Sequence, residues 1–393
     1  MKNTQMKRSV QGLWLILCLF CSASLCGQIK LSSGWQSSFV RITSEGKLIY
    51  IPDEKGNTIP DFSQVGYHHG NRSLPFPKVV DVVLTPVEGK DNRPMIQAAI
   101  DEVSRKQPDA DGHRGTILLK RGLYPVHGTI QISQSGIVLM GEGDNVHETC
   151  LLAVGKERFP LIKVSGKGRV EEIEGTRVRI TDHFVPVGTT SLTVEKSNAF
   201  RPGDRVIVVR PGTDEWIHDI RMDCIVERKG TRQWKASEYN LSYEREVIKV
   251  EGKRIYIDNP IVMQMEEKYG GGEVYKYSFN GRIREVGVMN ICLESEFEDY
   301  EDTNHGWIGL LFDKVENCWA CNITCRYFGY AGISCDTASK NVTVADCRCL
   351  EMKSMITGGF RYSFNNCGQQ NLFMNCQATE GRHDFVTGAK VCG

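Results

Sequence analysis

The residues best suited to chemistry in this chain form a short polar run near its C-terminal end. Glu380, Arg382, His383 and Asp384 follow one another closely there. His383 can act as a general base or acid, with Asp384 or Glu380 orienting its ring, and Arg382 can bind a substrate carboxylate through two N–H groups. We therefore expect His383, Arg382 and Asp384 to be catalytic. The simpler alternative is a solvated turn with a local Arg–Asp pair.

A second polar run covers residues 299–307, with Glu294 and Glu296 on the strand before it. Its carboxylates could bind calcium, so calcium stays open as a cofactor, but they could equally form an acidic surface loop, because no EF-hand spacing decides between the two. His305 is a further candidate catalytic residue. Trp307 beside it offers an aromatic face for a sugar ring.

Other candidates lie at separate points of the chain. Asp336 could supply the carboxylate of an acid–base pair, and Arg326 or Arg361 the positive charge. Trp216 stands in a polar and aromatic segment and is a candidate for substrate binding. Each of these residues alone is more often a surface residue than a catalyst.

The candidates leave two mechanisms open. A lyase removes the proton beside a uronate carboxyl group and needs a base and a stabilising positive charge. A hydrolase needs two suitably spaced carboxyl groups. Motifs for a serine nucleophile, a phosphate-binding loop or a dinucleotide site are absent from the sequence, which argues against nucleotide chemistry.

A repeat near the C-terminal end indicates the scaffold that would position these residues. Four segments share an apolar residue, then Asn or Asp, then a residue that can face a core. They are Val288-Met289-Asn290-Ile291, Ala320-Cys321-Asn322-Ile323, Ala345-Asp346-Cys347 and Phe373-Met374-Asn375-Cys376. Their polar members recur at intervals of 32 (322−290), 24 (346−322) and 29 (375−346) residues. This period predicts a solenoid, and the Val, Ile, Phe and Cys content predicts that it is built of strands.

One helix is expected ahead of the strands. Asn92 is placed to act as its N-cap and Pro94 lies in its first turn, and residues 95–103 carry an apolar face. Because the open end of a stack of strands must be covered, we expect this helix to be the cap. Strands are predicted soon after it, in residues 115–120, 128–132 and 136–143.

Several of these segments together resemble a known superfamily. Asp91-Asn92, residues 96–101, Gly115-Thr116-Ile117-Leu118-Leu119, Gly122-Leu123-Tyr124 and residues 136–143 resemble, in this order, the opening of the pectate-lyase-like superfamily. The resemblance, which also takes in the C-terminal repeats, implies an all-β fold, a right-handed parallel β-helix. It does not imply one reaction, because the superfamily includes lyases, glycoside hydrolases, esterases and phage tailspike depolymerases.

The expected organisation has five parts. They are a signal peptide (1–27), an extended N-terminal segment (28–75), a capping helix with the first coils (76–164), a β-rich insertion (165–280) and further coils (281–393). The last part ends within what looks like a new coil, so we expect the chain to be truncated there. We expect a monomer.

The N-terminal residues predict export. Lys2, Lys7 and Arg8 precede an apolar run that is too short for an ordinary membrane span, and small residues lead to a cleavage point near Gly27. We therefore expect a secreted or periplasmic protein without a stable membrane span. A lipid anchor at Cys26 is the less favoured alternative, because Leu25 is bulky for such a signal.

Charge and cysteine content limit the partners. Without residues 1–27 the balance is 45 basic against 48 acidic residues (48−3 against 48), which gives no general attraction to nucleic acid. Ten of the 15 cysteines fall between Cys292 and Cys392. We favour stacked core thiols at Cys321, Cys347 and Cys376 over disulfides, and we expect no zinc site, because no paired C-x-x-C spacing occurs.

These observations predict a secreted carbohydrate-active enzyme that cleaves a complex, uronate-containing polysaccharide. The alternative is a non-catalytic carbohydrate-binding or adhesive β-helix.

Overall fold

The computed structural model describes residues 36–388. The expected signal peptide and the chain end at Val391–Gly393 lie outside these residues. The chain divides into two compact units, residues 1–51 and residues 52–393. In the first unit, β1 (Val40–Ile42) pairs with β2 (Leu48–Tyr50) in an antiparallel hairpin.

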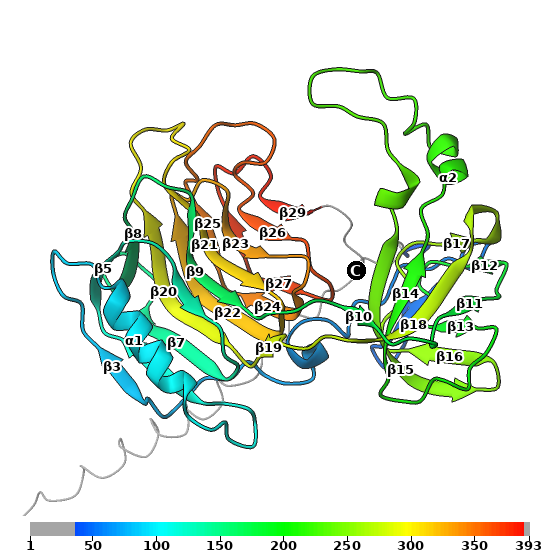
Figure 1. The fold of residues 1–393 in the computed structure, drawn as a ribbon, viewed down its shortest axis with the longest axis horizontal. Coiled ribbons are helices and arrows are strands. Elements are labelled where there is room, and N and C mark those ends of the chain that lie inside the picture. Colours follow the sequence, from blue (N-terminus) through cyan, green and yellow to red (C-terminus); the bar gives the residue numbers. More distant parts are fainter. Residues whose placement is uncertain (1–35, 389–393) are drawn as a thin grey trace, which may run out of the picture. The chain divides into compact units, whose positions relative to one another are not determined.

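Most of the second unit consists of three stacks of parallel strands (Figure 1). The first stack contains β3 (Val82–Leu84), β4 (Gly115–Leu119), β7 (Ile137–Gly143), β19 (Ile283–Arg284), β20 (Gly287–Ser295), β22 (Val315–Arg326), β24 (Lys340–Ala345) and β27 (Leu372–Met374). The second contains β5 (Gly122–Val126), β8 (Thr149–Ala153), the C-terminal parts of β20 and β22, β25 (Arg348–Leu350) and β28 (Gln377–Ala378). The third contains β6 (Ile130–Ile132), β9 (Phe159–Ser165), β21 (Gly306–Asp313), β23 (Ala331–Cys335), β26 (Phe364–Asn366) and β29 (Phe385–Thr387). The expectation of a mainly β protein with parallel strands is confirmed.

The strand registers reproduce the repeat read from the sequence. Val288 is the partner of Ala320, Ala320 of Val344, and Val344 of Phe373. These offsets are again 32 (320−288), 24 (344−320) and 29 (373−344) residues. We call each set of strands that adds one member to every stack, such as β7, β8 and β9, a rung.

The repeating Asn and Asp residues make the bend between the first and second stacks. Asn290, Asn322, Asp346 and Asn375 all have φ between 51° and 55°, a left-handed conformation that Asn and Asp tolerate better than most residues. Their side chains are aligned: Asn322 donates to Asn290 Oδ1 at 3.0 Å, and Asn375 donates to Asp346 Oδ1 at 3.2 Å. These four residues thus occupy the same position on four successive rungs, as the repeat in the sequence indicates.

Apolar side chains fill the space between the stacks. This core contains aliphatic residues from every rung together with Phe312, Phe328 and Phe364. The thiols of Cys325 and Cys349, which are register partners on β22 and β25, also lie in it, and Cys347 lies beside them. Cys376 packs against the same core, whereas Cys321 belongs to a smaller cluster with Trp319. The prediction of core thiols is thus confirmed for Cys347 and Cys376 but is wrong for Cys321, which lies on the other face of its strand.

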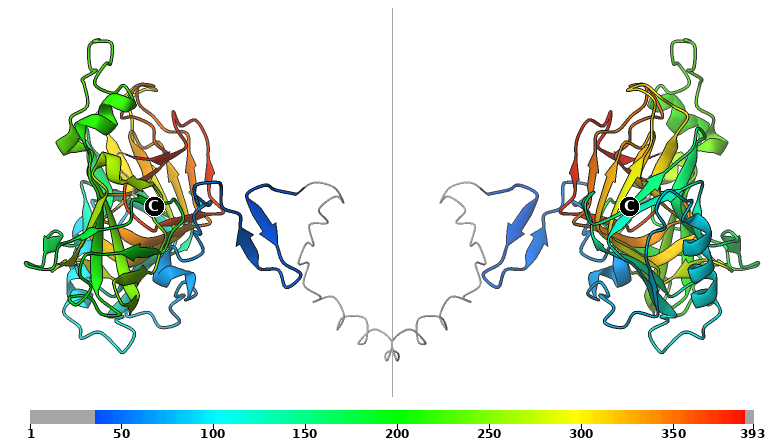
Figure 2. Two further views of the ribbon diagram at one scale, coloured as in Figure 1. Left: turned by 90° about the vertical axis from the view of Figure 1, so that its right-hand side faces the viewer. Right: turned by 90° about the vertical axis from the view of Figure 1, so that its left-hand side faces the viewer.

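The expected helix is α1 (Arg93–Ser104), which lies alongside the first strands of the stacks (Figures 1 and 2). Its predicted apolar face is buried in the core. Asn92 stands at the N-cap position, but its side chain accepts from the backbone N–H of Val87 and not from the helix. The role of α1 as a cap stays a prediction. Within residues 36–388, no helix has the length and apolar character needed to span a membrane.

A segment before α1 crosses the outer face of the first stack. It contains the short helix η1 (Tyr67–Gly70), in a region that we expected to be extended. The Tyr67 hydroxyl donates to Glu285 Oε2 at 2.6 Å, and the Tyr67 N–H donates to Thr343 Oγ1 at 2.8 Å. Because Gly66 also donates to the Gln370 carbonyl at 2.7 Å, this one segment ties several rungs together.

An antiparallel region lies between β9 and β19 in the sequence. Its elements are β10 (Glu171–Glu172), β11 (Val178–Ile180), β12 (Phe184–Val185), β13 (Ser191–Thr193), β14 (Arg205–Arg210), α2 (Asp214–Asp219), η2 (Ala236–Glu238), β15 (Leu241–Glu251), β16 (Arg254–Ile257), β17 (Met265–Glu266), η3 (Glu267–Tyr269) and β18 (Gly272–Ser278). It has its own apolar core. The domain boundaries expected from the sequence stay a prediction.

A buried ion pair anchors the antiparallel region to the stacked strands. Arg282 binds both carboxylate oxygens of Glu244, at 2.8 and 2.9 Å, and the Tyr277 hydroxyl donates to the same carboxylate at 2.8 Å. The Glu244 N–H donates to Gln369 Oε1 at 2.9 Å, next to β27. Burial raises the pKa of Glu244, but the hydrogen bonds and charge of Arg282 outweigh this effect and lower the pKa to about 2.

We predict that Glu244→Gln lowers the free energy of unfolding by about 3–5 kcal/mol, because it leaves the Arg282 charge buried without a counter-charge. Urea denaturation at neutral pH would measure the loss. The matched control is Glu251→Gln, which removes an exposed pair with Lys249 and should change little. Equal stabilities of the two variants would contradict the prediction.

Candidate functional site

Most of the predicted site residues gather where the strands of the third stack begin. His305 and Trp307 lie at the start of β21, Arg361 lies just before β26, and His383 lies just before β29. Because the strands are parallel and in register, all their N-terminal ends lie at one edge of the stack, with each residue about 4.8 Å from its counterpart on the next strand.

Four ring side chains form a row along this edge, which we call the ring row: Trp307, Tyr330, Tyr362 and His383. The ring centroids are 6.4 Å apart between Trp307 and Tyr330, 5.5 Å between Tyr330 and Tyr362, and 5.6 Å between Tyr362 and His383. Arg158, just before β9, extends the row with its Cζ atom 4.2 Å from the Trp307 ring. Successive strands thus contribute one flat group each.

The ring row has hydrogen-bonding groups as well as flat faces. Burial raises the pKa of Tyr330 to about 12, so its hydroxyl stays protonated at neutral pH. Trp307, Tyr330 and Tyr362 are half-buried and His383 is exposed. The row therefore presents apolar surface together with polar tips.

A cleft of about 650 Å³ lies beside the ring row, between the ends of the second stack and the starts of the third. We call it the corner cleft. Lys156, Glu294, Glu296, Glu298 and Asp302 are its charged lining residues. Phe297, His305 and Tyr327 also line it. The excess of carboxylates would suit acid–base chemistry or a hard cation, so calcium stays open.

His305 is held in place by both ring nitrogens. The ring is buried, Nε2 lies 2.9 Å from the Lys353 carbonyl oxygen, and Nδ1 lies 2.9 Å from Ser295 Oγ. Because a carbonyl only accepts, Nε2 carries the proton. In the neutral form of the ring, Nδ1 is an acceptor that competes with the Glu296 carbonyl, at 2.8 Å, for the single hydroxyl proton of Ser295. Burial lowers the pKa of His305 and favours this neutral form. The geometry favours a positioning role over the predicted catalytic one.

Two buried cations share one aromatic ring at this edge. The Lys353 Nζ atom lies 5.3 Å from the Tyr300 ring centroid, and the Arg361 Cζ atom lies 4.1 Å from it. Lys353 also faces Phe297 and Tyr327, at 5.6 and 5.5 Å. Among the described residues, one carboxylate, that of Glu380 at 4.0 Å, forms an ion pair with Lys353. We call Lys353 and Arg361 the cation pair.

Arg361, which was predicted to supply a positive charge at the site, is fully buried. Its Nη2 donates to the Tyr300 carbonyl at 2.8 Å, while Nε and Nη1 have no hydrogen-bond partner among residues 36–388. Buried cations with so little opposing charge are costly unless an anion approaches them. The cation pair could thus stabilise an acidic group.

Arg326, on β22, is bound by carboxylates from the rungs on either side. It contacts Glu294 at 3.3 Å and Glu351 at 2.7 Å, and its guanidinium lies 4.7 Å from the Tyr327 ring. It lies next to the corner cleft but is already paired.

The polar run at residues 380–384 forms a tight turn. The carboxylate of Asp384 accepts from Ser363 Oγ at 3.0 Å and from the Gly381 N–H at 3.1 Å. Among the described residues no hydrogen bond joins Asp384 to His383, so the expected orientation of His383 by Asp384 has no direct contact to support it. Arg382 is exposed beside His383.

Two predicted residues lie away from this edge. Asp336 follows the C-terminal end of β23 and accepts from the N–H of Thr337 within its own turn. Trp216 lies on α2, where it packs near Trp234 and Tyr239. The sequence pattern that marks a strand does not show at which edge of the stack the residues next to that strand will lie. For this reason the sequence could not show that Asp336 lies at the opposite edge from the other candidates.

Sequence reasoning missed Lys353, Tyr330 and Arg158. Each lies in a short connection whose length differs from rung to rung, so no repeat marks it. The offset of 23 residues (330−307) that aligns Trp307 with Tyr330 follows from the β21–β23 register, and only that register could have revealed the row.

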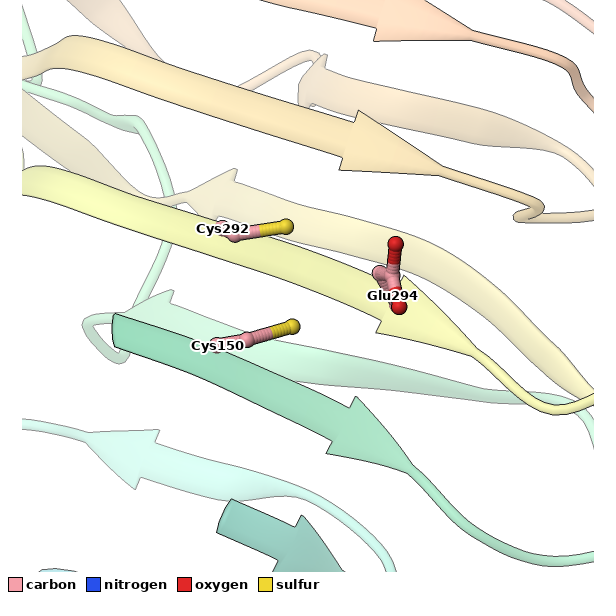
Figure 3. Close-up of side chains that lie close together, drawn as sticks. All are labelled: Cys150, Cys292 and Glu294. Atoms are coloured by element: carbon pink, nitrogen blue, oxygen red, sulfur yellow. The ribbon is translucent and has the colours of Figure 1, made fainter. Parts of the chain in front are cut away.

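One group of metal-type donors stands out among residues 36–388. Cys150, Cys292 and Glu294 offer ligand atoms that all lie within 4.8 Å of one another (Figure 3). No sequence motif marks this group, because Cys150 is 142 residues from Cys292 (292−150).

Comparisons with known proteins give likenesses of fold. The chain matches no protein-family model, and no curated protein sequence matches it. Among solved structures it is similar to the tailspike gp49 of Pseudomonas phage LKA1, with 14% identity and a TM-score of 0.37 over 72% of this chain and 38% of that one. It is also similar to a tailspike mutant of E. coli bacteriophage HK620 in complex with a pentasaccharide, with 11% identity and a TM-score of 0.36 over 87% of this chain and 39% of that one.

A third likeness is to a ι-carrageenase in complex with ι-carrageenan fragments, with 13% identity and a TM-score of 0.29 over 76% of this chain and 42% of that one. The chain thus spans less than half the length of these three proteins. We draw no functional conclusion from them, because identities and TM-scores are low. Membership of the pectate-lyase-like superfamily stays a prediction.

We predict that His305 makes stability depend on pH. Because its pKa in the folded protein lies below the usual value of 6.5, the unfolded chain binds the proton more readily, and stability falls as pH drops below about 6.5. The loss should reach at most about 1.4 kcal/mol per pH unit. Urea denaturation at about pH 7.5 and about pH 5.5 should show a smaller loss in His305→Gln. The exposed His127, changed to Gln, is the control, and an unchanged pH dependence in His305→Gln would refute the prediction.

Proposed function

We propose that this protein binds a polysaccharide along the ring row. The observation that carries this proposal is the row itself, because flat side chains spaced 5.5 to 6.4 Å apart can stack against successive sugar rings. The hydroxyl groups of Tyr330 and Tyr362 and the polar lining of the corner cleft can hydrogen-bond sugar hydroxyls.

The scaffold that we infer is a right-handed parallel β-helix, with α1 as its cap and residues 165–280 as an insertion. Three parallel stacks that each gain one strand per rung support this architecture. The burial of the apolar face of α1 in the core supports the capping role. We further propose a secreted or periplasmic monomer.

For the reaction we propose cleavage of an acidic, uronate-containing polysaccharide. The cation pair supports an acidic substrate, since an approaching carboxylate would offset its buried charge. The exposed His383, next to Arg382, is the proposed base or acid of a lyase, whereas the carboxylates of the corner cleft support a hydrolase equally well. The alternative function is carbohydrate binding without cleavage, which the ring row supports just as strongly.

We predict that Trp307→Ala and Tyr362→Ala each weaken polysaccharide binding about 10-fold, because each removes one stacking face. Affinity electrophoresis in gels containing pectic, algal or host glycans would measure the loss. The control is Trp216→Ala, which leaves the row intact and should bind normally. If wild type binds no glycan of the panel, or if the row variants bind as well as wild type does, the proposed function is wrong.

We predict that His383→Ala abolishes turnover while the circular dichroism spectrum is retained and glycan binding weakens by no more than about 10-fold, as expected for the loss of one ring of the row. The same panel, followed by absorbance of unsaturated uronate and by reducing-end release, identifies the reaction: absorbance indicates a lyase, and reducing ends alone indicate a hydrolase. His127→Ala serves as the control because His127 is also exposed. Normal turnover in His383→Ala would remove this residue as the catalyst, and binding without any turnover in wild type would favour the non-catalytic alternative.

A further inference from the structure

A cluster of two thiols and a carboxylate spans neighbouring strands of the second stack. Cys150 on β8 and Cys292 on β20 are register partners, and Glu294 follows Cys292 by two residues. Side chains at positions i and i+2 of a strand point to the same face, so all three side chains project from one side of the two strands. Figure 3 shows both sulfur atoms pointing the same way, with the Glu294 side chain beyond them.

These thiols are buried without belonging to the apolar core. Cys150 and Cys292 are 1% and 0% exposed, yet it is their neighbours Leu151 and Leu293 that pack in the core. The cluster therefore lies on the outer face of the stack. Buried thiols on that face, directly beside a carboxylate, are not explained by core packing.

The donor set is typical of a soft divalent cation. Two cysteine sulfurs and one carboxylate oxygen, all within 4.8 Å of one another, match the ligands and the close approach that Zn²⁺ uses in a site with three protein ligands. Calcium takes oxygen ligands almost exclusively and does not fit. A disulfide would use the two sulfurs but not the neighbouring carboxylate.

Local charge favours a bound ion. When Zn²⁺ binds, the two thiols release their protons to solvent, and the ion with two thiolates and one carboxylate has a net charge of −1. Arg326, whose Nη1 lies 3.3 Å from Glu294, offsets part of this charge. Because Arg326 is held more closely by Glu351, at 2.7 Å, Glu294 can turn to the metal while Arg326 stays in place.

We propose that Cys150, Cys292 and Glu294 form a zinc site at the wall of the corner cleft. Glu294 lines the cleft, so a fourth ligand, water or a substrate group, can reach the ion from there. The ion would join β8 to β20, which flank the antiparallel region in the sequence. It would thereby close a segment of 142 residues (292−150) and stabilise the fold. This proposal does not depend on the proposed function.

Cobalt is the probe for the test, because thiolate-bound Co²⁺ absorbs in the near ultraviolet. The full chain is purified with a reductant, freed of metal with a chelator and titrated with Co²⁺, then with Zn²⁺ in competition. We expect one equivalent of Co²⁺ with a sulfur-to-cobalt absorption band, displacement by Zn²⁺, and a higher melting temperature with metal. Cys292→Ser and Glu294→Gln should each weaken binding, the former by more than about 100-fold.

The control is Cys349→Ser. Cys349 and Cys325 are also buried register partners on neighbouring strands, but they lie in the core without a carboxylate ligand. This variant should bind cobalt as wild type does. The proposal is overturned if the wild-type chain shows no thiolate absorption, if Cys349→Ser abolishes binding as Cys292→Ser does, or if the mass of the unreduced chain reveals a Cys150–Cys292 disulfide. Circular dichroism of each variant separates loss of the site from loss of the fold.

Discussion

The structure depends on successive strands that lie parallel and in register at each stack. Bends of similar shape help to keep this register, and the left-handed Asn290, Asn322, Asp346 and Asn375 supply such a bend between the first and second stacks on four successive rungs. Most other residues would be strained in that conformation. Their side-chain hydrogen bonds hold neighbouring bends together. Backbone hydrogen bonds alone would allow one strand to shift along its neighbour. A shift by one residue, however, would turn the apolar side chains of that strand away from the core.

The same register creates the candidate site. Rungs differ in length, yet their strands begin at a common edge, so Trp307, Tyr330, Tyr362 and His383 come together from four separate segments of the chain. The bends and connections contain the candidate site residues, and the strands hold these residues in fixed positions. On the outer face of the second stack, the same alignment brings Cys150 beside Cys292. Residues far apart in sequence thus form both the ring row and the thiol cluster.

The sequence was informative where one physical rule decides the structure. The intervals of the Asn and Asp repeat gave the register, and the spacing of apolar residues gave the buried face of α1, because both depend on local periodicity. The site was predictable only in part. His383 and Trp307 were each identified as candidate site residues, but Lys353 and the hydrogen bonds of His305 depend on contacts across rungs. Such contacts follow from connection lengths, which no periodic pattern specifies.

The central claim is that one edge of the third stack is a binding surface for sugar rings. A crystal structure of the protein soaked with an oligosaccharide that it binds would test this claim most directly. We expect electron density for consecutive sugar rings against Trp307, Tyr330 and Tyr362, with an acidic substituent directed toward Lys353 and Arg361. Density on another face, with the ring row bare, would contradict it.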